Sequence, residues 1–350
     1  MPFNGFNMLK TPAKKAEEVP ATWVAVGNST RFAKSTDGIT WSNVGSKGGL
    51  AGDLNNVAYG NTRWVAVGGG VKIAYSPNGN TWTQAGSNSL STGLSVAYGK
   101  DGAGNGLWVA GGSNNLDIAT FLYSPDGISW TTSGSNGGII RYINSIAYGK
   151  DGAGNGLWVA VGNGSVIVKS PNGNDWYKAA TTGNITFFGY GVANGIAYGK
   201  DGSGAGRWVA VGSGATGTLI AYSPNGGDWY AAATKGGLDT TARSVAYGKD
   251  GAVNGRWVAV GDGSLITYSP NGNDWYAAAT TGGLNTAVFG VAYGKDSNDN
   301  GLWIAVGQGG GLIAYSPNGN DWYASATKGD LSTYGRSVAF KRILYDGVDI

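Results

Sequence analysis

Aspartates are almost the only side chains in this sequence that could perform acid–base chemistry. Cysteine and histidine are absent, so disulfides, thiol chemistry and the commonest general base and metal ligand are missing. The only glutamates, Glu17 and Glu18, lie near the N-terminus, before a repeated region that carries the aspartates. A hydrolase with paired carboxylates would therefore need two aspartates in environments that separate their pKa values.

The aspartates recur at equivalent places in a repeat, which argues against such asymmetry. One set directly follows a lysine: Asp101, Asp151, Asp201, Asp250 and Asp296. A second set directly precedes a tryptophan: Asp175, Asp228, Asp274 and Asp321. Near-identical copies offer near-identical environments, so we expect no enzyme and no catalytic residue.

The Lys-Asp segments are also the candidate cation sites, because calcium prefers closely spaced oxygen ligands. Each segment has one aspartate, except the last, which has Asp296 and Asp299, and none has a bidentate glutamate. The pattern favours a polar hairpin loop over a calcium site. We therefore expect no metal and no cofactor, with calcium as the alternative.

Fourteen tryptophans form seven pairs, and this regularity indicates one structural unit repeated seven times. The first members each open an apolar run: Trp23, Trp64, Trp108, Trp158, Trp208, Trp257 and Trp303. The second members each close a turn with the pattern Ser-x-Asp/Asn-Gly-x-x-Trp, called the box turn here: Trp41, Trp82, Trp130, Trp176, Trp229, Trp275 and Trp322.

Each unit is predicted to contain four β-strands, because its apolar runs are short, rich in Val, Ile, Tyr and Trp, and bounded by glycine and asparagine. The Asp-Gly or Asn-Gly of each box turn predicts a type I′ hairpin turn, in which both central residues have positive φ. Four-stranded antiparallel units in this number predict an all-β, seven-bladed propeller.

The two ends of the repeat predict a closed ring. The chain enters at the second strand of a unit, at Trp23, and finishes with an unpartnered first strand, Val338-Ala339-Phe340. That last strand completes the first blade, whereas a solenoid would leave both ends open. The expected organisation is an N-terminal arm at 1–20, a propeller at 21–345 and a tail at 346–350.

The box turn resembles the Asp-box of sialidase-type (BNR) propellers, Ser-x-Asp-x-Gly-x-x-Trp, and is one residue shorter. The resemblance covers about residues 21–342, and similar repeats are common in bacterial surface proteins and phage tail or virion proteins. It implies a structural role for the Asp or Asn of each turn: Asp37, Asn78, Asp126, Asn172, Asn225, Asn271 and Asn318. A sialidase-like site would also need a glutamate partner for its tyrosine nucleophile, which residues 21–345 lack.

Charge and hydropathy exclude two classes of partner. The net charge of +3 comes from scattered residues of both signs, so no basic face for nucleic acid is expected. No stretch is long and apolar enough to insert in a membrane, and no signal peptide is visible. The expected location is a virion, the extracellular space or a cell surface.

Three groups of residues are candidate ligand contacts. Arg243 and Arg336 each lie two residues before an inner strand, near the expected channel mouth, where they could hold an anion. The aromatic loop 182–195 carries Phe187, Phe188 and Tyr190. The third group follows the second tryptophan in blades 4 to 7, where it would pack at the rim or stack on sugars: Tyr177, Tyr230, Tyr276 and Tyr323.

The arm at 1–20 breaks the repeat and cannot form its own core. It could be disordered, or it could dock on another chain of an assembly through an apolar cluster: Phe3, Phe6, Met8 and Leu9. The leading hypothesis is thus a non-catalytic structural or interaction propeller of a virion or cell surface that binds protein or a receptor. The alternative is a lectin with sites repeated around the ring and cell-surface glycans as partners, and a third class is a glycosidase.

Overall fold

The computed structural model describes residues 23–341 except 71, 87–88, 165, 180, 183–191, 214–218 and 253. The arm, with Phe3, Phe6, Met8 and Leu9, and the tail at 346–350 lie outside the described residues. So do Phe187, Phe188 and Tyr190. Within the described residues, no helix is long and apolar enough to cross a membrane.

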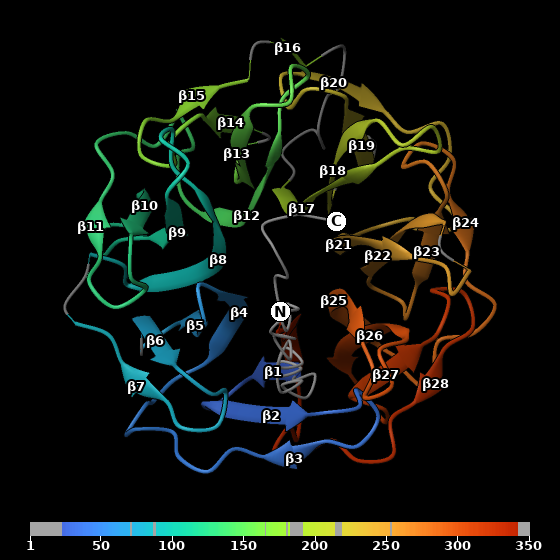
Figure 1. Ribbon diagram of the computed structural model, residues 1–350. Helices are drawn as coiled ribbons and strands as arrows, with labels where there is room; N and C mark the ends of the chain where they lie inside the picture. Colours follow the sequence, from blue (N-terminus) through green and yellow to red (C-terminus); the bar gives the residue numbers. More distant parts are fainter. Residues whose placement is uncertain are drawn as a thin grey trace, which may run out of the picture.

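Seven antiparallel sheets are arranged around a central axis as the blades of a propeller, as the sequence predicts (Figure 1). The strands nearest the axis are β4 (Leu54–Gly60), β8 (Thr92–Lys100), β12 (Ile143–Lys150), β17 (Val192–Lys200), β21 (Ala242–Lys249), β25 (Ala287–Lys295) and β29 (Gly335–Phe340). The second strands are β1 (Trp23–Gly27), β5 (Arg63–Gly68), β9 (Gly106–Ser113), β13 (Gly156–Gly162), β18 (Gly206–Ser213), β22 (Gly255–Gly261) and β26 (Gly301–Gln308).

Two further strands complete each blade toward the rim. The third strands are β2 (Arg31–Ser35), β6 (Lys72–Ser76), β10 (Ala119–Ser124), β14 (Ile167–Ser170), β19 (Ile220–Ser223), β23 (Ile266–Ser269) and β27 (Ile313–Ser316). The outer strands are β3 (Ser42–Asn43), β7 (Thr83–Gln84), β11 (Thr131–Thr132), β15 (Tyr177–Lys178), β20 (Asp228–Ala231), β24 (Tyr276–Ala277) and β28 (Tyr323–Ala324). Blade 5 gains a short parallel strand, β16 (Thr181–Thr182), beside β20, which the repeat does not predict.

The ring closes through the last strand, as predicted. β29 pairs antiparallel with β1, with Trp23 opposite Phe340 and Val24 opposite Ala339. Blade 1 therefore combines strands from both ends of the propeller, in the order β29-β1-β2-β3. Closure leaves no unpaired inner strand in the ring.

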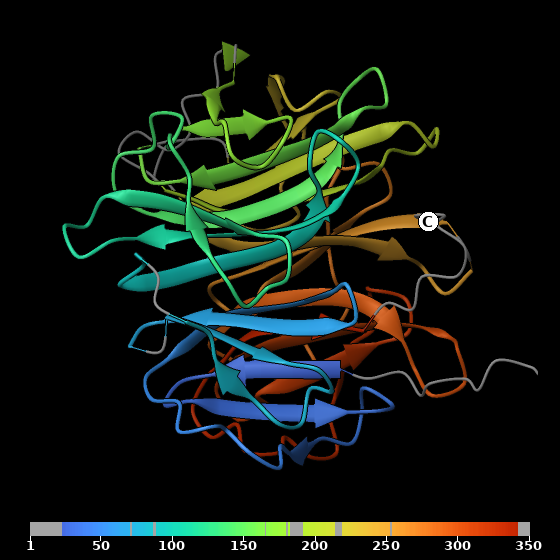
Figure 2. The same ribbon diagram turned by 60° about the vertical axis from the view of Figure 1, so that its left-hand side comes forward.

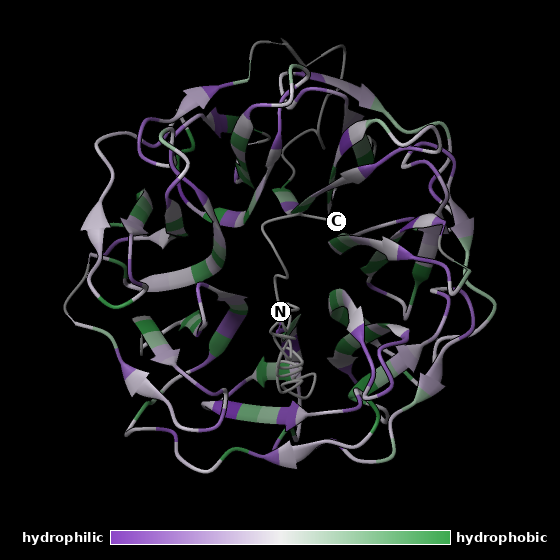
Figure 3. Ribbon diagram, in the orientation of Figure 1, coloured by the Kyte–Doolittle hydropathy of each residue, from purple (hydrophilic) through white to green (hydrophobic). Residues whose placement is uncertain are grey.

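Figure 2 shows the blades obliquely, and Figure 3 shows hydrophobic residues along their strands. Buried apolar residues of neighbouring blades form shared clusters, such as Val24 of blade 1 with Trp64 of blade 2. The first tryptophan of every pair is fully buried between two blades. In five blades its indole N–H donates to the carbonyl of the Lys-Asp loop of the preceding blade, as from Trp158 to Lys100 at 2.8 Å. The tryptophans therefore join the blades by both packing and hydrogen bonding.

Trp108 lacks this hydrogen bond for a local reason. Its preceding blade joins β4 to β5 by a tight turn, in which Asn61 and Thr62 have φ of 43° and 60°, instead of a Lys-Asp loop. The buried indole N–H of Trp108 finds no partner among the described residues. A buried donor without a partner costs about 1–3 kcal/mol.

Replacing Asn61-Thr62-Arg63 by the Lys-Asp-Gly-Ala-Gly-Asn-Gly-Leu of blade 3 is therefore expected to stabilise the fold. The gain in unfolding free energy should be about 1 kcal/mol, because the graft supplies the missing carbonyl to Trp108. Urea unfolding of the graft in wild-type and Trp108→Phe backgrounds measures this contribution. An equal gain in both backgrounds would show that the indole N–H is not the cause.

The second tryptophan wedges against the third strand of the preceding blade. The ring centroids of Phe32 and Trp82 are 4.3 Å apart, and those of Phe121 and Trp176 are 3.9 Å apart and nearly parallel. Aromatic contact of this kind adds about 0.5–1.5 kcal/mol beyond area burial. The second tryptophan therefore packs between blades at these two junctions.

The expected type I′ geometry of the box turns is wrong. Only the glycine has positive φ, for example 71° at Gly127, while the preceding Asp or Asn does not. The Asp126 carboxylate instead accepts the N–H groups of Ile128 and Ser129, both at 2.8 Å, and Ser124 Oγ accepts that of Gly127. The side chains thus stabilise a wider loop, in which one residue alone needs the left-handed conformation.

Blades 1 and 3 carry Asp37 and Asp126 where the other box turns carry asparagine. Partial burial raises the pKa of both carboxyls, but hydrogen bonds from the backbone N–H groups two and three residues further on outweigh it, so both pKa values lie below the ordinary aspartate value. Their stabilising contribution is therefore full above the unfolded pKa of about 3.9 and is lost as the pH falls through the folded values.

We expect Asp37→Asn/Asp126→Asn to fold within about 1 kcal/mol of wild type at pH 7, because an asparagine oxygen accepts the same bonds at Asn78. Between pH 5 and 3 the variant should lose less unfolding free energy than wild type. Thermal unfolding across this range is the measurement. Parallel pH profiles for the two proteins would contradict the assignment.

Candidate functional site

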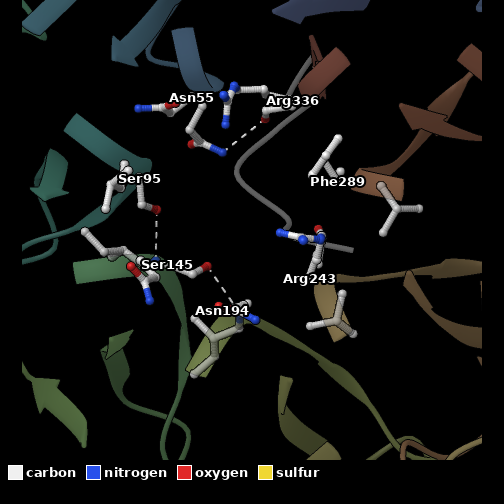
Figure 4. Close-up of a pocket in the computed structure, with 18 of the residues that line it drawn as sticks. Asn55, Ser95, Ser145, Asn194, Arg243, Phe289 and Arg336 are labelled. Atoms are coloured by element: carbon white, nitrogen blue, oxygen red, sulfur yellow. Dashed lines mark hydrogen bonds between the residues drawn. The ribbon is translucent and has the colours of Figure 1, made fainter. Parts of the chain in front are cut away.

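A cavity of about 260 Å³ lies at the channel mouth, where the inner strands of all seven blades begin (Figure 4). Its wall has three tiers. The deepest holds Val or Ile, the next Ser, Asn or Gly, and the outermost varies. We call this outermost tier the mouth residues: Asn55, Leu94, Asn144, Asn194, Arg243, Phe289 and Arg336.

A β-bulge presents each mouth residue to the channel. Every inner strand shifts register against its second strand at this point, for example between Ala242 and Ser244, and the skipped residue is the mouth residue. Bulges re-aim side chains and often lie beside functional sites. Because the bulge leaves the residue outside the regular pairing, its side chain can vary without disturbing the sheet.

The asparagines of the mouth connect neighbouring blades. Asn144 Nδ2 donates to the carbonyl of Ala193 at 3.0 Å, and Asn194 Nδ2 donates to that of Ala242 at 3.0 Å. Asn55 makes the equivalent bond to Gly93 at 2.8 Å. In each case the acceptor directly precedes the next mouth residue, so these side chains serve the ring itself.

Blades 6, 7 and 1 form a different wall, built from arginines and aromatic rings. The Arg243 guanidinium lies 4.9 Å from the Phe289 ring centre, and Phe289 meets Tyr334 edge-to-face at 5.9 Å. Arg336 lies 5.9 Å from Tyr334. Gln308 Nε2 is 3.3 Å from the Tyr334 hydroxyl oxygen. We call Arg243, Phe289, Tyr334 and Arg336 the aromatic wall.

Arg243 and Arg336 thus lie at the channel mouth, as predicted, but each has an acidic neighbour. Arg243 pairs with Asp262 through two hydrogen bonds, Nε to Oδ1 at 2.5 Å and Nη2 to Oδ2 at 3.0 Å. Arg336 donates to Asn28 at 2.7 Å and lies 3.5 Å from Asp53. These aspartates offset the two positive charges, so the mouth suits a partner that offers apolar surface with few net charges.

The Lys-Asp loops use their carboxylates internally. Asp101 Oδ1 accepts the N–H groups of Ala103 and Asn105 at 2.9 and 2.8 Å, while Oδ2 accepts the Asn105 side chain. Hydrogen bonds from the side chain and backbone of Asn105 lower the pKa of Asp101 most. This is the geometry of a polar hairpin loop. Among the described residues no three Asp, Glu, His or Cys side chains gather as metal ligands would.

The four candidate tyrosines are exposed at the rim instead of being packed in a core. Tyr177, Tyr230, Tyr276 and Tyr323 are 58%, 47%, 52% and 51% exposed. Three of them lie beside the tyrosine of the adjacent third strand, as Tyr230 does beside Tyr222 at 5.6 Å. These tyrosines lie on the outer strands of their blades, whereas the mouth residues lie on the inner strands. The tyrosines therefore form a separate surface.

Two kinds of partner of these residues were not predicted from the sequence. Asp262, which neutralises Arg243, lies in the loop after β22, and its distance in sequence hides the pairing. Tyr222, Tyr268 and Tyr315 precede the box-turn serine in blades 5 to 7. Their fixed distance from the box turn is the sequence signal that places each of them opposite the outer-strand tyrosine of the same hairpin.

No protein-family model matches the chain, and no curated protein matches it. Among solved structures, YCF48 bound to D1 peptide is similar with 14% identity and a TM-score of 0.53, over 95% of this chain and 98% of that one. YCF48 from Cyanidioschyzon merolae has 15% identity and a TM-score of 0.50, over 78% and 84%. The computationally designed Ika8 protein has 9% identity and a TM-score of 0.54, over 92% and 88%. These likenesses show the propeller fold alone.

Proposed function

We propose that this chain is a non-catalytic binding propeller of a virion or cell surface that engages a protein segment at its channel mouth. The observation that carries the proposal is the variation of the mouth residues. The deepest tier is Val or Ile and the next is Ser, Asn or Gly in every blade, whereas the mouth ranges from Asn to Leu, Phe and Arg. The fold does not require this variation, so a ligand contact is its better explanation.

The chemistry of the aromatic wall supports a protein partner. Phe289 and Tyr334 offer ring faces and edges, and the paired arginines add planar donors, a combination typical of interface hot spots. YCF48, a propeller of the same fold, has been solved with D1 peptide bound. A non-catalytic role fits the repeated aspartates, whose oxygens accept hydrogen bonds within turns and loops. Such a protein needs no cofactor.

Site-specific photo-cross-linking tests the proposal in the particles or cells that make the protein. A photoreactive residue at Leu94, in the mouth, should yield one discrete protein adduct. The same probe at Asn105, in the Lys-Asp loop of blade 3, is the matched control and should yield none. Equal yields at both positions would refute the mouth as the binding site. Turnover of a fluorogenic sialoside that Arg243→Ala abolishes would identify an enzyme instead.

We further propose that the arm at 1–20 docks the propeller on another chain of its assembly. Removing residues 1–20 should prevent incorporation into the parent particle while leaving the thermal unfolding midpoint of the propeller unchanged. Unchanged incorporation of the shortened chain would reject the docking role.

Carbohydrate binding is the second candidate function, and a specific observation favours it. The exposed tyrosines of blades 4 to 7 lie at the rim, on a surface separate from the channel mouth. A glycan ligand and a protein ligand would therefore occupy different parts of the molecule.

A further inference from the structure

Blades 5, 6 and 7 each present two tyrosines side by side at the rim. The ring centres of Tyr222 and Tyr230 are 5.6 Å apart and tilted by 32°. The equivalent pairs in blades 6 and 7 are 5.7 and 5.6 Å apart and both tilted by 35°. The third-strand tyrosine is partly buried in each pair, and the outer-strand tyrosine is exposed. The same arrangement of two neighbouring tyrosines thus recurs in three consecutive blades.

The fold does not need the exposed tyrosines. Ser42, Thr83 and Thr131 occupy the same place in blades 1 to 3, with the same pairing between third and outer strand. Those blades form complete four-stranded sheets with small hydroxyl side chains. Half-exposed aromatic rings therefore need an explanation other than folding.

In blades 5 and 6 an arginine stacks on the third-strand tyrosine of the pair and holds it in place. The Arg207 guanidinium lies 4.7 Å from the ring centre of Tyr222, and its Nη1 donates to the Asn271 carbonyl of the next blade at 2.6 Å. Arg256 repeats both contacts, at 4.6 Å from Tyr268 and 2.6 Å from the Asn318 carbonyl. The inner ring of these pairs is thereby held before any ligand arrives, which lowers the ordering cost of binding.

The groups around these two pairs are polar, and an aspartate offsets the charge of each arginine. Asp201 lies 3.2 Å from Arg207, and Asp250 lies 3.9 Å from Arg256. The neighbouring box turns add Asn-Asp pairs, such as Asn271 Nδ2 bonded to Asp274 at 2.8 Å. A ligand at these sites would meet an aromatic face together with amide and carboxylate groups, which favour a neutral, hydroxyl-bearing ligand over an anionic one.

We propose that the rims of blades 5, 6 and 7 form a row of binding sites for a neutral glycan chain. The C–H face of a sugar stacks on the exposed ring of Tyr230, Tyr276 or Tyr323, and its hydroxyls bond to nearby polar groups. A repeating polymer fits a surface that repeats once per blade, whereas a protein partner would present three different segments to three similar sites. Each shallow site binds weakly, and the row gains affinity through avidity.

The third site differs from the other two, and this difference predicts which site contributes least to glycan binding. In blade 7, Leu302 stands where Arg207 and Arg256 stand in the preceding blades, and the next box turn offers Asp37 and Thr40 in place of an Asn-Asp pair. Because no arginine at this position stacks on Tyr315, the site in blade 7 should contribute least to glycan affinity. Tyr177 of blade 4 lies across from Lys169 instead of a second tyrosine, and we leave it out of the row.

The inference extends binding beyond the proposed protein contact, and an array of neutral oligosaccharides and polysaccharides tests it. Wild type should bind at least one glucan, mannan, galactan or chitin fragment at about 1 mM sugar or below. Single substitutions Tyr230→Thr or Tyr276→Thr should weaken that binding about 3- to 10-fold, and Tyr323→Thr less. The triple variant should lose about 100-fold or more, because avidity disappears with the sites.

Threonine is the natural occupant of this position in blades 2 and 3, so the variants should fold, and circular dichroism and thermal unfolding verify this. Tyr142→Thr, which removes a tyrosine directly before the inner strand β12, is the control and should keep full glycan binding. No glycan bound by wild type, or equal binding by the triple variant, would overturn the inference. Loss of glycan binding with an unchanged cross-link at Leu94 supports it and separates the rim from the mouth.

Discussion

Ending the chain after Tyr334 should leave a protein that cannot form its ring. This change removes β29, and with it the inner strand of blade 1 and one mouth residue. Trp23, fully buried in the intact ring, would lose the ring of Phe340 at 4.8 Å, and β1 would lose its backbone partners on the inner side. The expected loss is roughly 5–10 kcal/mol of unfolding free energy, comparable to the whole stability of a domain.

Circular dichroism, size-exclusion chromatography and binding of a hydrophobic dye would measure this effect. The shortened chain should aggregate and bind the dye strongly. A matched rescue variant carries residues 335–341 before Trp23, joined by the Gly-Ala-Gly-Asn-Gly segment of blade 3, and lacks them at the C-terminus. It should fold like wild type. Cooperative unfolding of the truncated chain at the wild-type midpoint would disprove closure by β29.

Gly149→Ala should destabilise the propeller by about 3 kcal/mol or more. In six of the seven inner strands an aromatic ring packs closely on a glycine of the preceding blade, and Tyr198 covers Gly149 in this way. A Cβ on Gly149 would lie 2.2 Å from Tyr198 Cγ and 2.6 Å from its Cβ. These atoms sit next to the backbone, so the side chain cannot yield by changing its rotamer and the two blades must separate.

Urea unfolding of Gly149→Ala and of a control glycine variant measures this close approach. Gly134→Ala is the control, because a Cβ there meets nothing within 4 Å and its φ is not positive. It should change the unfolding free energy by less than about 0.5 kcal/mol. Similar losses in the two variants would show that inter-blade contact is not the cause.

The repeat predicts the architecture because every blade must bury the same faces. Paired tryptophans determine the number of blades, and the leftover Val338-Ala339-Phe340 determines how the ring closes. The turn type was predicted wrongly at Asn78 and its equivalents. The Asn-Gly signal was interpreted as a two-residue hairpin, whereas the asparagine oxygen accepts two backbone N–H groups and widens the turn.

The site was only partly predictable. The position of Arg243 and Arg336 at the mouth follows from their place in the sequence, two residues before an inner-strand motif. The bulges that direct their side chains depend on pairing between strands, which a local sequence pattern does not predict. Their neutralisation by Asp262 and Asp53 depends on loops that meet only in the ring. The exposure of Tyr230 could not be predicted, because sequence alternation does not say which face a neighbouring blade covers.

The most direct test of the central claim, that the aromatic wall binds a partner, is the triple variant Arg243→Asn/Phe289→Asn/Arg336→Asn. Asparagine occupies the same mouth position in blades 2, 4 and 5 and bonds to the next blade, so the ring should tolerate it. The measurement is the yield of the protein adduct from a photoreactive residue at Leu94. We predict a folded variant whose adduct falls at least about 10-fold, as expected when interface anchors are lost. A folded variant with undiminished adduct would contradict the account.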